Sequence, residues 1–323
     1  MIMLLDLWNK ETLAQKFMDL YNLSGIQMCN ILKELYFDFN QDSVSVFCEK
    51  TGIKLDELDV TNDIEFVGKI VSTTTDDFAH LKQAGLVPID ILLENDSPIS
   101  RHLKKYGLEI KPSSHKLIYN GKQFYIPRNG TDCKYCAYGD DKCKFDDKKY
   151  KDMYCPYLKS IAPLATKLYS DNAEIELFLI SQREEMLGYS RVKYHPEIFD
   201  TIETLMKKLF KKELKIGDEW EKQKQTSYIV ALNVKYEDMS YRNGYIRGTD
   251  GWDAINTYSN YEKYCNNVYD LTEDIPKCFW DNVWLIQTCL SVICSFGNSS
   301  DQICAGVKHN VMFPYNKLKI ELI

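Results

Sequence analysis

The sequence predicts a mixed α+β fold, built on a mixed or antiparallel sheet. Strand-like runs occur both early and late in the chain, and the helix-like stretches between them do not alternate with strands as regularly as a doubly wound parallel sheet requires. Hydrophobic residues make up 45% of the 323 residues and charged residues 27%, which is typical of a globular protein with a sizeable core. We therefore expect one or two globular domains and no large disordered region.

The N-terminal part is expected to be helical. Residues 10–36 carry apolar side chains at helical spacing, interrupted at Ser24–Gly25, and predict a helical hairpin. Residues 43–50 alternate in polarity and fit either a short strand or the end of a helix. We expect an N-terminal helical segment over 1–62 and an α+β core domain over 63–323.

The strands of the core are predicted from β-branched and apolar runs. They cover residues 64–75, 108–110, 116–119, 123–126, 175–180, 227–234, 302–307 and 317–323. The Asn120–Gly121 pair links two of these runs, and both residue types tolerate the positive φ of a type I′ turn. The pair therefore predicts a β-hairpin.

The helices of the core are predicted from apolar periodicity and from capping residues. They cover residues 77–84, 88–93, 99–106, 196–215 and 280–296. The first should have an aspartate as its N-cap and end at Gly85. The fourth carries a run of lysines, interpreted either as a local basic face or as an ordinary solvated helix face: Lys207, Lys208, Lys211, Lys212 and Lys215.

Four cysteines with metal-ligand spacing lie in an insertion at about 128–163 that has almost no periodicity. Cys133 and Cys136 are separated by two residues, Cys143 follows after six more, and Cys155 follows after a further eleven. Two thiolates on a tight turn can bind one metal ion, and a later pair can complete a tetrahedron. We predict a structural zinc site, because a closed set of four thiolates leaves no open position for catalysis.

Two alternatives to zinc stay open for these cysteines. An iron–sulfur cluster also binds four cysteines, although with other spacings. A redox-active Cys-x-x-Cys pair should lie near a βαβ unit, whereas this pair follows a hairpin. Because no segment resembles a signal peptide and no apolar run approaches 18 residues, we expect a cytoplasmic protein with reduced cysteines and no membrane contact.

Charge and standard motifs exclude several classes of function. The net charge of −7 argues against a uniform electrostatic attraction to nucleic acid, so any such contact needs a local basic face. The chain has no P-loop, no Gly-x-Ser-x-Gly motif, no His-Glu-x-x-His motif and no Gly-x-Gly-x-x-Gly motif.

Residues 71–86, VSTTTDDFAHLKQAGL, combine a strand, a hydroxyl-rich exit, a short capped helix and a Gly-Leu pair. This stretch resembles the entry to the NAD pocket in the ADP-ribosyltransferase superfamily, most closely in its nucleic-acid-targeting toxins and RNA 2′-phosphotransferases. The resemblance implies an ADP-ribosyltransferase-type sheet core and NAD as co-substrate. It places Thr74 where the family has a catalytic His or Arg, and Thr73, Thr75 and Asp77 against the cofactor; Arg191 is a further candidate cofactor ligand.

The C-terminal residues are similar to the closing region of the same family. Ser299–Cys304 precede a late strand, and a Pro-containing turn follows. In that family an acidic residue at this place stabilises the charge that develops as nicotinamide leaves, and Asp301 is the candidate here. The resemblance implies a toxin or phage-defence enzyme that transfers ADP-ribose from NAD to a nucleic-acid or protein acceptor, with an antitoxin or another protein as a possible partner.

Other interpretations remain open. The chain could be a non-catalytic, zinc-stapled adaptor that binds nucleic acid or protein, and residues 72–75 could be a plain strand end followed by a cap. The Glu109-Ile110-Lys111 stretch has the Glu-x-Lys pattern of some metal-dependent nucleases, but it lacks a clear partner carboxylate on a preceding strand. The 241–252 loop, rich in arginine, aromatic residues and glycine, suits a mobile lid, a nucleotide-binding loop or an ordinary surface loop.

Overall fold

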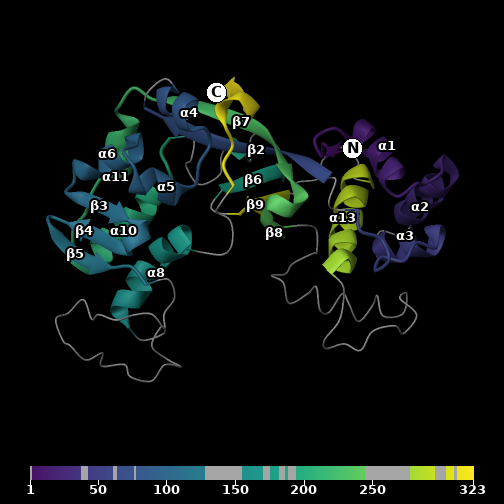
Figure 1. The fold of residues 1–323 in the computed structure, drawn as a ribbon, viewed down its shortest axis with the longest axis horizontal. Helices are drawn as coiled ribbons and strands as arrows, with labels where there is room; N and C mark the ends of the chain where they lie inside the picture. Colours follow the sequence, from purple (N-terminus) through teal and green to yellow (C-terminus); the bar gives the residue numbers. More distant parts are fainter. Residues whose placement is uncertain are drawn as a thin grey trace. The chain divides into compact units, whose positions relative to one another are not determined.

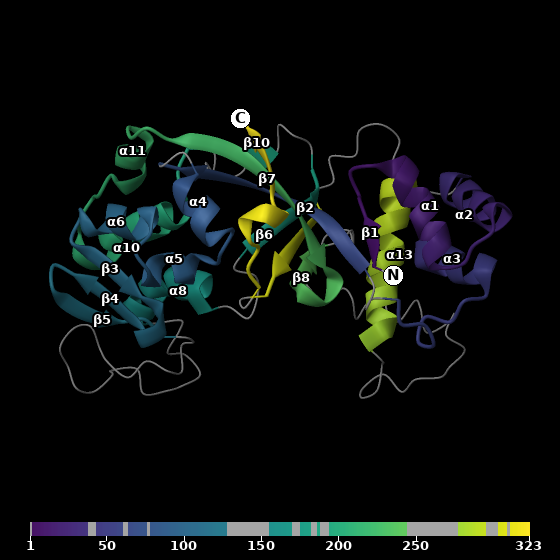
Figure 2. The ribbon, with the colours of Figure 1, turned by 45° about the horizontal axis from the view of Figure 1, so that its top comes forward.

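The computed structural model confirms a mixed α+β protein with antiparallel sheets (Figures 1 and 2). It describes residues 2–37, 43–60, 64–75, 78–127, 155–169, 175–181, 186–187, 194–243, 277–294, 303–308 and 311–323. Within these ranges, no helix is both long enough and apolar enough to cross a membrane.

The larger sheet has seven strands, and β2 lies inside it. The strand order is β10-β7-β2-β6-β9-β8, and β1 also pairs with β2. Their bounds are β1 Met3–Leu5, β2 Ile64–Thr74, β6 Ile175–Ile180, β7 Thr226–Lys235, β8 Met239–Asn243, β9 Ile303–Val307 and β10 Lys319–Leu322. The β1–β2 pair is parallel, whereas β10 is antiparallel to β7.

The smaller sheet is an antiparallel meander of β3 (Leu108–Lys111), β4 (Lys116–Tyr119) and β5 (Lys122–Tyr125). Tyr119 pairs with Lys122 across the second turn. Asn120 and Gly121 between them have φ values of 49° and 79°. The predicted two-residue hairpin with positive φ at both central residues is therefore confirmed.

The chain divides into two compact units, each made of several segments. Unit 1 comprises Met1–Gly68, Phe178–Gln182 and Asn233–Ala305. Unit 2 comprises Lys69–Leu177, Arg183–Leu232 and Gly306–Ile323.

Helices of unit 1 pack around a buried C-terminal helix. They are α1 Lys10–Leu20, α2 Gly25–Phe37, α3 Ser43–Thr51 and α13 Lys277–Cys294, with a 3₁₀ turn, η5, at Tyr236–Asp238. α13 contacts α1, α2 and α3, and Phe17 and Phe47 meet edge to face in this core. The expected helical hairpin and the helix near 280–296 are confirmed.

Residues 43–50 form a helix and not a strand. Val44 and Phe47, three residues apart, are both buried, and the Thr51 hydroxyl donates to the carbonyl of Phe47 four residues earlier. A short apolar run fits strand and helix about equally by its pattern, and packing against α2 and α13 decides between them here.

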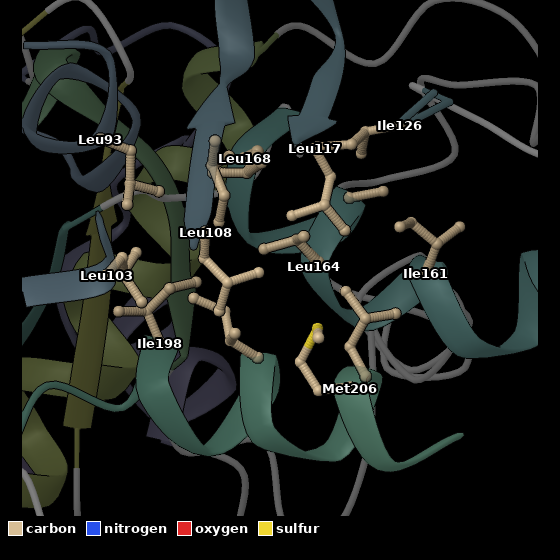
Figure 3. Packing of buried hydrophobic residues seen from close by; sticks show 14 of the residues in the cluster. Leu93, Leu103, Leu108, Leu117, Ile126, Ile161, Leu164, Leu168, Ile198 and Met206 are labelled. Atoms are coloured by element: carbon tan, nitrogen blue, oxygen red, sulfur yellow. The ribbon is translucent and has the colours of Figure 1, made fainter. Parts of the chain in front are cut away.

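The helices of unit 2 gather around the smaller sheet, except α4 (Ala79–Ala84), which contacts the turn at Tyr315–Lys317. The others are α5 Ile89–Glu94, α6 Pro98–Lys104, α8 Pro156–Tyr169, α10 Ile198–Phe210 and α11 Ile216–Glu221, with 3₁₀ turns η2 at Pro112–Ser114 and η6 at Tyr315–Lys317. Figure 3 shows how α8 and α10 meet the sheet: Leu164 and Met206 from the two helices converge with Leu117 from β4. This cluster is the main apolar core of unit 2.

The single helix expected over 196–215 is two helices. α10 ends because Lys211 adopts a left-handed conformation with φ of 54°, and the amide of Lys212 then donates to the carbonyl of Met206. Glycine is the usual residue at such a C-terminal cap, so the sequence carries no ordinary stop signal at this point. A separate helix, α11, begins at Ile216.

A buried amide on α13 joins three segments of unit 1. The side-chain nitrogen of Asn282 lies 2.9 Å, 2.6 Å and 2.9 Å from the carbonyl oxygens of Leu55, Leu58 and Cys278. Its side-chain oxygen accepts a hydrogen bond of 3.0 Å from the Tyr21 hydroxyl. The residue has no exposed surface, so water cannot replace these partners.

Replacing Asn282 by alanine should lower the free energy of unfolding by about 3 kcal/mol, because buried carbonyls and one hydroxyl lose their partner. Urea denaturation followed by circular dichroism measures the change. Thr288→Val on the same helix is the matched control: the Thr288 hydroxyl is buried and has no partner among the described residues, so its removal should not lower the free energy of unfolding. Equal losses in the two variants would contradict the assigned role of Asn282.

Candidate functional site

The exit of β2 buries two adjacent threonines. In an alternating strand one of two neighbours normally faces solvent, yet Thr73 and Thr74 are each only 7% exposed. The Thr73 hydroxyl is buried and has no hydrogen-bond partner among the described residues. A buried hydroxyl without a partner costs about 1–3 kcal/mol, and a bound water or a ligand can supply the partner.

The residue before α4 has a strained backbone. Phe78 has φ of 67°, a left-handed conformation that is uncommon for a bulky side chain. Its ring meets that of Tyr228 on β7 edge to face, with ring centroids 4.8 Å apart. Backbone strain of this kind persists only where the surroundings impose it, and it is concentrated at functional sites.

The predicted aspartate cap of this helix is wrong. α4 begins at Ala79, and Phe78 in the capping position makes no side-chain bond to the helix. Asp77 lies outside the described residues. His80 follows in the first turn, and its Nε2 atom is buried with no partner in the described part of the chain.

The end of α4 is held against the C-terminal segment. Gly85 has φ of 74°, as predicted for a glycine that ends a helix, and a Cβ atom on it would lie 2.2 Å from the Phe313 carbonyl oxygen. Leu86 and Phe313 exchange two backbone hydrogen bonds of 2.8 Å and 3.0 Å. Glycine is thus required at position 85, and the bridge brings the Gly-Leu pair beside the Phe-Pro turn of the C-terminal region.

Of the residues expected in the site, the structure describes Thr73, Thr74 and Thr75, which are adjacent in the sequence. Asp77, Arg191 and Asp301 lie outside the described residues, as do three of the expected zinc ligands, Cys133, Cys136 and Cys143.

The fourth expected ligand, Cys155, is described. It is a free cysteine, only 6% exposed, that directly precedes α8 and packs within the apolar cluster of unit 2. Within the part of the chain that the structure describes, no three His, Cys, Asp or Glu side chains are grouped as a metal site.

The Glu-x-Lys stretch on β3 lies at a small hollow. Glu109 and Lys111 line it together with Glu94 and Asp96. The Lys111 ammonium donates to the carbonyl of Glu94, and the Glu94 carboxylate accepts from the amide of Ser113, each at 3.0 Å. The Asp96 carboxylate pairs with Arg101, and among the described residues no three acids are grouped as the metal site that such a nuclease requires.

Two buried histidines that the sequence does not mark as a pair hold α11 in place. His195 lies between two carboxylates, with Nδ1 2.8 Å from Glu221 and Nε2 3.1 Å from Asp200. A Cβ on Gly217 would lie 3.0 Å from the ring, which leaves no room for a ligand. The acids lie on opposite sides of the imidazole, so this cluster connects α10 to α11 and cannot bind one metal ion with all three groups.

The second histidine, His102, is buried beside Trp220 and Phe199. Its Nδ1 lies 2.9 Å from the side-chain nitrogen of Gln223, which can only donate, so its Nε2 donates to the carbonyl of Ile216 at 2.9 Å. Burial in this apolar setting lowers the pKa of His102 below its ordinary value of 6.5, and the bond to Ile216 opposes that shift only in part.

The lowered pKa of His102 predicts a loss of stability in acid. The unfolded chain takes up a proton near pH 6.5 that the folded protein binds only at lower pH, so the contribution is full above pH 6.5 and is lost as pH falls toward the folded pKa. His102→Gln should therefore show a smaller drop in urea midpoint between pH 7.5 and 5.5 than the parent protein. Equal drops in both proteins would contradict this account.

No match to the chain was found among family models, among curated proteins or among solved structures.

Proposed function

We propose that the protein is an ADP-ribosyltransferase-like enzyme, with a sheet core of that type and its active site at the exit of β2. The observation that carries the proposal is the backbone bridge between Leu86 and Phe313. It joins the two stretches, residues 71–86 and the C-terminal region, whose sequences resemble that family. Two local features support a binding role: the partnerless hydroxyl of Thr73 and the strained Phe78 against Tyr228.

In the proposed reaction the bond between nicotinamide and the ribose C1′ of NAD breaks, and an acceptor nucleophile forms a bond to C1′ and loses its proton. Thr73, Thr75, Asp77 and Arg191 would hold NAD, and Asp301 would stabilise the cationic ribose. Thr74 occupies the place of the His or Arg of the family, and a hydroxyl there can orient the substrate but carries no positive charge.

The biological setting belongs to the same proposal. An enzyme of this kind would act in the cytoplasm as a toxin or in phage defence, on a nucleic-acid or protein acceptor, and an antitoxin or another protein would restrain it. The proposal also includes a structural zinc ion bound by Cys133, Cys136, Cys143 and Cys155. Of these four cysteines the structure describes Cys155, which is buried directly before α8.

Incubation of the protein with labelled NAD and RNA, DNA or protein acceptors tests the activity. Thr73→Val keeps the shape of the side chain and removes the hydroxyl, so transfer should fall about ten-fold, the effect of losing about 1.4 kcal/mol of binding. Asp301→Ala should abolish transfer. Thr288→Val, the matched substitution in unit 1, should leave the rate unchanged; a folded protein that neither binds NAD nor transfers from it would refute the proposal.

Metal analysis of the purified protein tests the zinc site separately. We expect about one zinc per chain, and a loss of that metal with Cys133→Ser or Cys155→Ser. Cys278→Ser serves as the control, because this cysteine donates to the carbonyl of Asp56 and lies outside the proposed ligand set. Iron in place of zinc, or equal metal content in all variants, would be inconsistent with this site.

A further inference from the structure

We propose that one surface of unit 2 binds single-stranded nucleic acid. It is formed by the β4–β5 hairpin and the C-terminal end of α10, and we call it the lysine–aromatic surface. Its members are Tyr119, Lys122, Phe124, Lys207, Lys208, Phe210, Lys211, Lys212 and Lys215.

The positive charge of this surface is largely unneutralised. Residues 207–215 contain five lysines and one acid, and all five lysines are exposed. The acid, Glu213, pairs with Lys207 at 2.8 Å. Within the described residues no ion pair joins Lys208, Lys211, Lys212 or Lys215 to a carboxylate, so four ammonium groups in one short segment remain available to phosphates.

Aromatic rings border the lysine segment, because Phe210 lies between Lys208 and Lys211 in the sequence. Phe210, at the end of α10, contacts Tyr119 on β4 and Phe124 on β5, with ring centroids 5.1 Å and 4.8 Å apart. All three side chains are partly exposed. The trio therefore leaves some ring surface exposed, and Phe210 within it belongs to the segment that carries the lysines.

The register of the hairpin adds another positive charge on the same face. Tyr119 pairs with Lys122 and Leu117 pairs with Phe124, and directly paired residues point to the same side of a sheet. Because side chains alternate along each strand, Tyr119, Lys122 and Phe124 all share the face that packs on α10. Lys122 is exposed and thus adds a positive charge to the part of the lysine–aromatic surface that the hairpin forms.

The combination of exposed lysines and exposed aromatic rings indicates which kind of ligand the surface binds. Lysines alone attract any polyanion, but adjacent exposed rings favour a polyanion that carries flat rings, which are the bases of a nucleic acid. A duplex hides the faces of its bases, whereas a single strand offers both its phosphates and its bases. The net charge of −7 repels a polyanion over the rest of the chain, which directs binding to this surface.

Nucleic acid is one of the acceptors of the proposed function, but its binding at the lysine–aromatic surface does not depend on that function. Binding is measured without NAD. If the protein binds a single strand but transfers no ADP-ribose, the proposed enzyme activity is refuted and the proposed binding surface is supported. If it transfers ADP-ribose to a protein acceptor but binds no nucleic acid, the enzyme activity is supported and the binding surface is refuted.

Fluorescence anisotropy with labelled oligouridine, oligothymidine and a duplex of equal length tests the surface. We expect both single strands to bind more tightly than the duplex, and comparison of the two shows whether the 2′-hydroxyl contributes. Replacing Lys208, Lys211 and Lys212 together by glutamine should weaken binding at least ten-fold. It should also reduce the slope of log affinity against log salt by about two, since each phosphate contact on a single strand contributes about 0.7.

A charge-matched triple variant is the control. Lys33, Lys317 and Lys319 are exposed and lie outside the surface, so their replacement by glutamine changes the net charge equally but should leave binding and the salt slope nearly unchanged. Phe124→Leu should weaken binding about five-fold or more without altering the salt slope, because it removes stacking and no charge.

Three results would overturn the inference. They are no binding by the folded protein at low salt, equal losses in the two triple variants, and binding of polyglutamate or anionic vesicles as tight as that of the single strands.

Discussion

Backbone pairing of β2 is the constraint on which the larger sheet depends. This strand lies inside the sheet, with β7 and β6 as neighbours, and buried peptide groups must find partners there because water cannot reach them. That requirement holds the strand in register as far as Thr74. The features of the proposed site then follow at its exit, so the position of the Thr73 hydroxyl is set by backbone pairing and not by its own side-chain contacts.

Most strands and helices could be predicted from the sequence because their signals are local. Asn120–Gly121 needs no distant partner to form its turn, and the β-branched run of β2 suits a strand wherever it packs. Local signals failed where packing or backbone strain decides. The short apolar run at Ser43–Thr51 fits a strand as well as a helix. The left-handed residue that separates α10 from α11 is Lys211, and the sequence has no glycine there to predict it.

The candidate site was predictable only in part, for the same reason. The hydroxyl-rich stretch 73–75 is visible in the sequence, but whether the Thr73 hydroxyl finds a partner among the described residues depends on its surroundings. The contact between Leu86 and Phe313 joins distant parts of the chain, as does the meeting of Phe210 with the hairpin. The lysines of residues 207–215 were evident from the sequence alone, whereas the contact of Phe210 with the rings of the hairpin required the tertiary structure.

The smaller sheet has a consequence for the order of folding. All its pairings join residues within 108–125, so closing its loops costs little chain entropy and it can form in microseconds. The β10–β7 pairing instead joins residues 319–322 to 228–231, and must wait for distant segments to meet. The meander is therefore expected to be an early template on which α8 and α10 condense, so that Leu117 has its apolar partners before the last strand of the larger sheet is in place.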